Sequence, residues 1–488
     1  MGGGVSATRA ALVRGEVRAV ALVEAALERI AAHNDALGAY LTVDAEGALA
    51  AAVALDARIA QGDDLAGLPL AGATVAVKDA FCTRGLRTTC GSRMLERFVP
   101  PYDATAVARL RAAGAVVLGK ANMDEFSMGS STERSAFGPA RNPWDTTRIP
   151  GGSSGGSAVA VAAGLATLGL GSDTGGSVRQ PAALTGLVGL KPTYGRVSRY
   201  GLVAYASSLD VVSPMARTVE DCAAMYLVLA GHDPRDATSY ARPVEAPALT
   251  GPAALRGLRV GVPVEYFGEG VEASVRARVE SALAAMQSAG AVLVPLSMPG
   301  TDDALACYYV LSPAEASSNL ARYDGVRYGL RVTGAGPGAD LGAMYEATRR
   351  AGFGPEVQRR ILLGTFVLSA GHFDAFYARA VAARGRIAAE FAAAFETVDV
   401  LATPTAPTEA FALGEKLDDP VAMYQADVCT LPASLAGVPA ASVPVGLGAA
   451  GMPVGMQLIA PAFAEARLLA VCHAVEALVG PLPPPPGW

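Results

Sequence analysis

Short apolar, β-branched runs that alternate with helical segments constrain the fold of this chain more than any other feature. Seven runs are typical of buried strands, at residues 74–77, 115–120, 258–262, 291–294, 398–402, 441–445 and 455–459. Segments with helical spacing separate several of them, at residues 105–113, 271–288 and 378–395. This alternation predicts an α/β fold in which layers of helices sandwich one long, mostly buried sheet.

The two ends of the chain differ from this pattern. Residues 1–60 are rich in Ala, Leu and Val with charges at helical spacing, which predicts two helices joined near residues 33–35 and packed on the core. Residues 61–480 are expected to form one large α/β unit together with this helical segment. The last eight residues, 481–488, read PLPPPPGW and predict an extended, proline-rich tail.

Composition excludes several classes of function. Hydrophobic residues make up 51% and charged residues 17% of the 488 residues, which is enough apolar material for a large core. The net charge of −6 gives no overall basic surface for wrapping nucleic acid, and no apolar run is long enough to span a membrane. Six scattered cysteines lack metal-ligand spacing, so we expect buried thiols in the reducing cytoplasm and no metal site.

Residues 151–181 contain two glycine- and serine-rich clusters on either side of an apolar stretch. A flexible linker is disfavoured because residues 157–163 are apolar and helix-forming. A phosphate-binding loop is disfavoured because G-x-x-x-x-G-K-[ST] is absent and residues 169–174 lack the third glycine of G-x-G-x-x-G. The remaining interpretation is that the clusters are two parts of a catalytic site.

The second cluster offers a nucleophile but no nearby histidine base. Residues 174–177 read TGGS, so successive backbone N–H groups can converge on one oxygen beside the Ser177 hydroxyl. None of the four histidines follows a G-x-S-x-G motif, and H-E-x-x-H is absent. A lysine kept neutral by burial can replace histidine as the base, and Lys78 ends an apolar strand. Either Ser153 or Ser154 could then relay the proton.

These motifs closely resemble those of the amidase signature family: GGSSGGS at residues 151–157, GSDTGGSVRQP at 171–181 and AVKD at 76–79. Members of that family have a large mixed central sheet sandwiched between helices. They use a Ser–cis-Ser–Lys triad, so the resemblance implies that Lys78, Ser153 and Ser177 are catalytic and that the Gly152–Ser153 peptide is cis. It also implies an oxyanion hole formed by the N–H groups of Thr174, Gly175, Gly176 and Ser177.

Within the family, the chain is similar over nearly its whole length to the A subunits of aspartyl/glutamyl-tRNA amidotransferases. The similarity is carried by residues 122–133, 191–210, 307–329 and 352–366. It implies that Ser177 hydrolyses glutamine and that the ammonia converts Glu-tRNA(Gln), Asp-tRNA(Asn) or both into the amidated product. It further implies that Arg360, Asp427 and Tyr308 bind the glutamine, with Arg359 as the alternative arginine.

The same resemblance implies the partners of the chain. We expect a heterotrimer with a B subunit, which uses ATP and Mg²⁺ to activate the misacylated tRNA, and with a small C subunit. The present chain itself is expected to need no cofactor and to make little direct contact with the tRNA. Two other functions remain open: a stand-alone amidase acting on small amides, and a non-catalytic scaffold.

Overall fold

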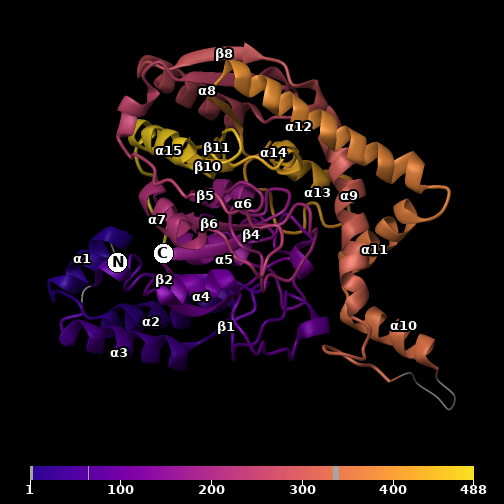
Figure 1. Cartoon of the computed structure of the whole chain (residues 1–488), viewed down its shortest axis with the longest axis horizontal. Helices are drawn as coiled ribbons and strands as arrows, with labels where there is room; N and C mark the ends of the chain where they lie inside the picture. The colour runs from indigo at the N-terminus through magenta and orange to yellow at the C-terminus, as the bar shows by residue number, and fades with distance from the viewer. Residues whose placement is uncertain (1–3, 64, 334–339) are drawn as a thin grey trace.

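A computed structural model describes residues 4–63, 65–333 and 340–488 (Figure 1). Its centre is one eleven-stranded sheet with the order β1-β3-β2-β4-β6-β5-β10-β11-β9-β7-β8. The strands are β1 (Tyr40–Val43), β2 (Thr74–Lys78), β3 (Val116–Ala121), β4 (Leu168–Asp173), β5 (Val188–Lys191), β6 (Val211–Ala216), β7 (Arg259–Pro263), β8 (Val292–Leu296), β9 (Val400–Pro404), β10 (Ala440–Leu447) and β11 (Pro453–Ile459). The expected α/β fold is therefore confirmed.

Helices cover the sheet and extend from it. They are α1 (Val5–Val13), α2 (Ala19–Leu37), α3 (Ala45–Ala60), α4 (Thr105–Ala112), α5 (Gly155–Ala162), α6 (Arg179–Thr185), α7 (Val219–Leu229), α8 (Ala273–Ser288), α9 (Ala304–Asn319), α10 (Leu341–Gly352), α11 (Pro355–Leu368), α12 (Arg379–Thr397), α13 (Pro420–Tyr424), α14 (Leu431–Ala436) and α15 (Glu465–Val479). Figure 1 shows α1, α2 and α3 at one end of the molecule, and α9 to α12 along one side. Among the described helices, no single one is long and apolar enough to span a membrane, whereas α11 and residues 373–397 pass that test only as a sharply bent pair.

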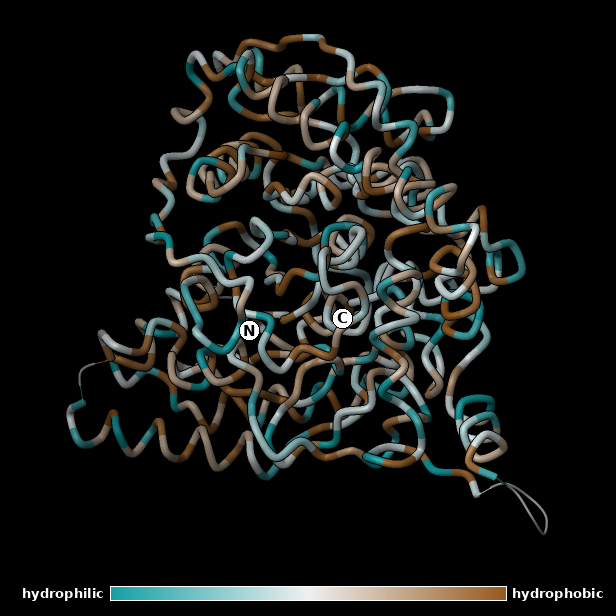
Figure 2. Tube along the Cα trace, turned by 45° about the vertical axis from the view of Figure 1, so that its right-hand side comes forward, coloured by the Kyte–Doolittle hydropathy of each residue, from teal (hydrophilic) through white to brown (hydrophobic). Residues whose placement is uncertain are grey.

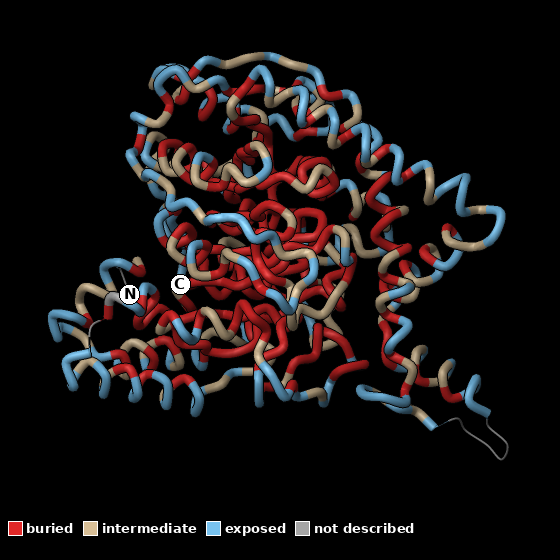
Figure 3. The backbone as a smooth tube through the Cα atoms, in the orientation of Figure 1, coloured by how far each residue is buried: buried red, intermediate tan, exposed pale blue. Residues whose placement is uncertain are grey.

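The sheet is mixed because its ends and its middle pair differently. Strands β3, β2 and β4 run parallel, as do β9, β7 and β8 at the other end. The six strands from β4 to β9 pair antiparallel, and so does the edge strand β1 with β3. Buried residues fill the centre of the molecule in Figure 3, while hydrophobic and hydrophilic residues alternate along the outer helices in Figure 2. The core thus lies on both faces of the sheet.

All seven predicted strands are present, each within two residues of its expected ends. The sequence did not predict β1, β4, β5 or β6, and glycine explains why β4 and β5 were missed. A Cβ on Gly171 of β4 would lie 2.6 Å from Val178 Cγ2, and one on Gly189 of β5 would lie 2.7 Å from Ala182 Cβ. These glycines let the segments around α5 and α6 pack closely on the sheet, and they also remove the β-branched signal of a strand.

The prediction of two helices joined near residues 33–35 is wrong. Residues 5–60 form three helices and strand β1, and α2 continues through Asn34 to Leu37. It ends at Gly38, which has a left-handed φ of 60°. The Asn34 side chain accepts a hydrogen bond of 2.7 Å from Tyr40 N and so ties the end of the helix to the start of β1.

Replacing Gly171 with alanine tests the close packing of β4. The new Cβ would also lie 2.9 Å from Ser154 Oγ, and overpacking of this kind costs ~1–3 kcal/mol. We expect a lower melting temperature for Gly171→Ala by differential scanning calorimetry. Gly385→Ala in α12 is the control, because nothing lies within 4 Å of its added Cβ and alanine favours a helix. An unchanged melting temperature for Gly171→Ala would contradict this packing.

Candidate active site

Lys78 and Ser153 are in contact, and Ser177 lies next to them because Ser154 N donates to Ser177 O at 3.2 Å. Lys78 is the last residue of β2, Ser153 lies in the loop before α5, and Ser177 lies between β4 and α6. Lys78 Nζ lies 2.7 Å from Ser153 Oγ and 3.0 Å from Ser172 Oγ. Lys78 and Ser153 are fully buried, while Ser177 is 7% exposed. The serine at the mouth of the site is therefore the one that a substrate can reach.

The surroundings of Lys78 favour its neutral form. Burial lowers the pKa of its ammonium group to about 7, although Asp124, Asp210 and Asp173 act in the opposite direction. Among the described residues, no carboxylate is close enough to form an ion pair with it. A neutral amine 2.7 Å from a hydroxyl can accept its proton, so Lys78 is placed to act as a base.

The structure distinguishes the two serines of the first cluster. Only Ser153 contacts Lys78, since the Ser154 hydroxyl donates to the Ser172 carbonyl at 3.2 Å. The Gly152–Ser153 peptide is cis. Gly152 N donates to Gln180 Oε1 at 3.0 Å, and a Cβ on Gly152 would lie 2.2 Å from Asp124 Oδ2. A glycine before Ser153 is thus required by the close approach of Asp124.

A buried ion pair holds the loop that carries Ser177. Arg179 Nη2 and Nε bind the two carboxylate oxygens of Asp173 at 2.8 and 3.0 Å, and both residues are fully buried. Burial raises the pKa of Asp173, but the Arg179 guanidinium more than offsets this, so the net shift is downward. Arg179 also donates to Thr430 O and Gln457 Oε1. The bidentate pair therefore fixes the loop to the sheet and to the segment before α14.

Backbone donors of this loop are free to bind an anion. Within the described residues, the N–H groups of residues 174–177 donate no hydrogen bond. Gly176 has a φ of +140°, and a Cβ there would lie 2.1 Å from Thr430 Oγ1. A Cβ on Gly175 would lie 2.7 Å from the ring of Tyr308. The Thr174 hydroxyl donates to Asp210 Oδ1 at 2.7 Å, which fixes the start of the loop.

Arg360 lies among aromatic rings near this loop. It is 3% exposed on α11, and its guanidinium carbon lies 5.2 to 5.6 Å from the ring centres of Tyr205, Tyr309 and Tyr424. Its Nε donates to Glu356 Oε1 at 2.8 Å and its Nη1 to Tyr205 at 2.6 Å. Among the described residues Nη2 of Arg360 has no hydrogen-bond acceptor, so this side of the guanidinium group is free to bind a ligand.

The alternative arginine, Arg359, has a different position. Its side chain is 44% exposed and pairs with the outer oxygen of Glu356. Since Arg360 is buried beside the nucleophile loop and Arg359 is at the surface, only Arg360 lies where a buried ligand could meet it. Sequence reasoning could not separate two adjacent arginines, because the phase of α11 decides which one points inward.

Asp427 presents an unpaired carboxylate oxygen to the same region. Oδ2 accepts a hydrogen bond from Ser130, whereas Oδ1 is buried and has no hydrogen-bond partner among the described residues. Burial raises the pKa of Asp427 to about 7. Thr430 links it to the nucleophile loop, because Thr430 N donates to Asp427 O and its hydroxyl to Gly175 O at 2.6 Å. A buried, unpaired carboxylate oxygen is suited to a cationic ligand group.

Several supporting residues were missed in the sequence: Ser172, Asp124, Asp210 and the pair Asp173–Arg179. The last pair lies inside the motif at residues 171–181, where a charged side chain among small and apolar residues signals a buried ion pair. Ser172 lies in the same motif, whereas Asp124 and Asp210 lie in loops far from it in the chain, so only the fold brings these two to the site. Among the described residues, no cluster of His, Cys, Asp or Glu is arranged to hold a metal ion.

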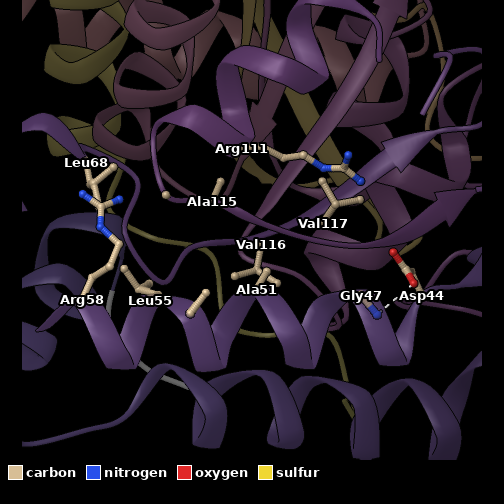
Figure 4. A pocket seen from close by; sticks show the side chains of 12 residues that line it. Asp44, Gly47, Ala51, Leu55, Arg58, Leu68, Arg111, Ala115, Val116 and Val117 are labelled. Atoms are coloured by element: carbon tan, nitrogen blue, oxygen red, sulfur yellow. Dashed lines mark hydrogen bonds between the residues drawn. The ribbon is translucent and has the colours of Figure 1, made fainter. Parts of the chain in front are cut away.

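A separate pocket of about 360 Å³ lies between α3 and β3 (Figure 4). Asp44 caps α3 there by accepting a hydrogen bond from Gly47 N at 3.1 Å. Its two arginines are already paired, Arg58 with Asp63 and Arg111 with Asp103. No candidate catalytic or substrate-binding residue lines this pocket, so it is not part of the candidate site.

Comparison with known proteins agrees with this geometry. The A subunit of glutamyl-tRNA(Gln) amidotransferase from Roseiflexus sp. (strain RS-1) is 58% identical over 475 residues, which cover 97% of this chain and 95% of that protein. The corresponding protein of Symbiobacterium thermophilum is 57% identical over 462 residues, 95% of this chain and 94% of the relative. Each relative thus matches this chain from end to end rather than in one motif.

Two solved structures show the same fold. The A subunit of glutamyl-tRNA(Gln) amidotransferase from Thermotoga maritima matches with a TM-score of 0.79 and 41% identity, over 96% of this chain and 94% of that one. Native peptide amidase of Stenotrophomonas maltophilia matches with a TM-score of 0.82 and 32% identity, over 99% and 98%. The model of the amidase family matches residues 21–469. The chain therefore belongs to the amidase family.

Proposed function

We propose that this chain is the glutamine-hydrolysing subunit of a tRNA-dependent amidotransferase, which supplies ammonia to convert Glu-tRNA(Gln), Asp-tRNA(Asn) or both. The observation that carries the proposal is two buried, oppositely charged side chains near the loop of Ser177. Thr430 links Asp427 to that loop, and Arg360 lies against Tyr309, which contacts Tyr308 beside Gly175. Glutamine is an amide that carries both an α-carboxylate and an α-ammonium group. A simple aliphatic or aromatic amide would use neither side chain.

The first half of the reaction forms an acyl-enzyme. Ser177 Oγ attacks the side-chain amide carbon of glutamine, and its proton passes through Ser153 to the neutral Lys78. The amide oxygen becomes an oxyanion, which the free N–H groups of Thr174, Gly175, Gly176 and Ser177 hold, and each such donor is worth about 3 kcal/mol. The carbon–nitrogen bond then breaks as the proton returns from Lys78 to the nitrogen, so ammonia leaves.

Water completes the cycle. With the amine gone, Lys78 is neutral again and accepts a proton from water through Ser153. The hydroxide equivalent attacks the γ-glutamyl ester of Ser177 through a second oxyanion in the same loop. The ester bond breaks, the proton returns to Ser177 Oγ, and glutamate is released. The same three side chains serve both halves because the two tetrahedral intermediates carry their charge at the same place.

The substrate is positioned by the two charged groups on its α-carbon. In this proposal the free Nη2 of Arg360 binds the α-carboxylate, and the unpaired Oδ1 of Asp427 accepts from the α-ammonium group. Tyr308, which is 4% exposed beside Gly175, is a third contact. A charged donor and a charged acceptor that bind the two groups on the α-carbon fix the end of glutamine remote from the amide, and this orients the amide for attack at its carbon.

The names of the relatives supply the expected setting, since they describe the A subunit of a larger enzyme. We propose a heterotrimer in which the B subunit binds ATP, Mg²⁺ and the misacylated tRNA, and a small C subunit joins the other two chains. No cofactor is assigned to this chain. All six cysteines are free and buried, which fits a protein of the reducing cytoplasm.

Loss of the nucleophile tests the reaction. Ser177→Ala should lower ammonia release from glutamine by about 10³-fold or more, since the attacking oxygen is removed. The measurement is a coupled ammonia assay on the chain purified with its partner subunits. Ser288→Ala, an exposed serine on α8, is the matched control and should keep full activity. Full glutaminase activity in Ser177→Ala would rule out this nucleophile.

Substrate choice tests the role of the buried charges. Arg360→Gln should lower kcat/KM for glutamine by about 10- to 100-fold, because a hydrogen bond to a charged group is worth about 1.5–3 kcal/mol. Hydrolysis of butyramide, which lacks both charged groups, should change little. The adjacent Arg359→Gln is the matched control and should leave both values close to wild type. If wild type prefers butyramide to glutamine, the chain is a stand-alone amidase for small amides instead.

A further inference from the structure

A second concentration of unused charge lies away from the active site. Arg93, Arg97 and Arg331 line a surface cavity of about 510 Å³ between the short 3₁₀ helix η2 (Arg93–Leu95) and residues 329–331. All three arginines are exposed. One carboxylate, Glu96, shares the lining, so the cavity keeps an excess of positive charge in a chain whose net charge is −6.

None of these three arginines is neutralised by the protein. Within residues 4–63, 65–333 and 340–488, they form no ion pair and donate no hydrogen bond. The pocket between α3 and β3, which Figure 4 shows with Arg58 and Arg111, is the contrast. Each of these two arginines pairs with an aspartate at 2.9 Å. Three guanidinium groups that share a cavity and form no ion pair repel one another and attract an anion from outside.

The backbone beneath the cavity is held in place. Leu330 N donates to Met94 O at 2.7 Å, which joins the two segments that carry the arginines. Ser92 caps η2 through a hydrogen bond of 3.1 Å from Met94 N, and Thr88 N donates to Phe98 O at 2.9 Å. Gly329 has a φ of +84°, and a Cβ there would lie 2.7 Å from Met94 O. These hydrogen bonds fix the backbone positions from which the three arginine side chains extend.

Aromatic rings lie at the edge of the same cavity. Phe98 is part of the lining, and its ring centre lies 6.3 Å from that of Tyr328, which is 40% exposed. Tyr328 in turn contacts the buried Tyr323, with ring centres 5.8 Å apart. Arginines beside an exposed, supported aromatic ring are the combination that binds a ribose–phosphate backbone and stacks on a base.

We infer that Arg93, Arg97 and Arg331 bind phosphate groups of an RNA backbone, with Tyr328 offering a ring to a neighbouring base. The inference rests on the proposed function, because that function brings a tRNA to the complex. A guanidinium fork matches a phosphate group in shape and charge, and it is the residue type used for such contacts. The contact is local, since the acidic chain as a whole offers no general attraction for RNA. The inferred site would give this chain a direct contact with the tRNA, whereas the sequence analysis expected little direct contact.

The salt dependence of RNA binding tests this inference. The probe is a fluorescein-labelled tRNA(Gln) transcript, titrated by anisotropy with the complex of this chain and its partner subunits between 50 and 300 mM KCl. Each phosphate contact contributes about 0.7–0.9 to the slope of log Kd against log[KCl]. Arg93→Ala/Arg97→Ala/Arg331→Ala should therefore lower that slope by about 2 and raise Kd by about 10-fold or more. The corresponding triple lysine variant should keep most of the slope.

A matched control separates this site from a general loss of charge. Arg14→Ala/Arg58→Ala/Arg350→Ala removes the same charge from exposed arginines that are each paired with a carboxylate. It should leave the slope within about 0.5 of wild type. An equal loss in the control, or no loss in the cavity variant, would overturn the inference. Loss of a partner subunit from the cavity variant with an unchanged tRNA slope would also overturn it and identify an acidic protein segment as the occupant.

Glutamine hydrolysis without tRNA keeps this test independent of the proposed function. Both triple variants should release ammonia at the wild-type rate, because the cavity residues lie outside the catalytic loops. Failure of the wild-type protein to hydrolyse glutamine would count against the proposed function, while the anisotropy titration would still report on the cavity. Inorganic phosphate at 10 mM should compete only weakly with tRNA. Full displacement by phosphate would show that the cavity holds a small phosphate ligand and overturn the RNA assignment.

Discussion

The removal of Lys78 from water is the constraint on which the rest of the site depends. The lysine lies at the end of a fully buried strand, and its nearest polar neighbours are the hydroxyls of Ser153 and Ser172. Another buried lysine, Lys120, shows the alternative: it lies 3.3 Å from Asp79 and donates to Phe81 O and Thr88. Lys120 has a counterion and holds the fold together. Lys78 has none, and its stable neutral form can accept a proton.

Everything around Lys78 keeps the two serines at its side and the oxyanion donors free. The Asp173–Arg179 pair anchors the loop of Ser177, and the glycines at 175 and 176 leave room for Tyr308 and Thr430. The same Thr430 carries the contact on to Asp427. Thr430 contacts both Arg179 and Asp427, so one connected structure fixes the position of the candidate nucleophile and that of the candidate substrate-binding carboxylate.

The sequence predicted the α/β class and seven strands because β-branched runs are a direct signal of burial in a sheet. It missed β4 because glycines stand where β-branched side chains would signal a strand. The same glycines allow α5 to pack closely on β4. The three candidate catalytic residues could be named from motifs. Their supporting contacts could not, because Asp124 and Asp210 reach the site only through the fold. The sequence could not decide between Ser153 and Ser154, or between Arg360 and Arg359, because each choice depends on where the side chain points in the folded protein.

The pH dependence of acylation tests the central claim most directly. A fluorophosphonate probe labels an activated serine, so its labelling rate at Ser177 reports how readily the proton leaves. Lys78 must be neutral to take that proton, and burial lowers its pKa to about 7. The labelling rate should therefore rise with pH through a single ionisation near pH 7 and then level off. A rate that still climbs towards the ordinary lysine value of 10.5, or one that does not change between pH 5.5 and 9.5, which brackets about 7, would contradict the account.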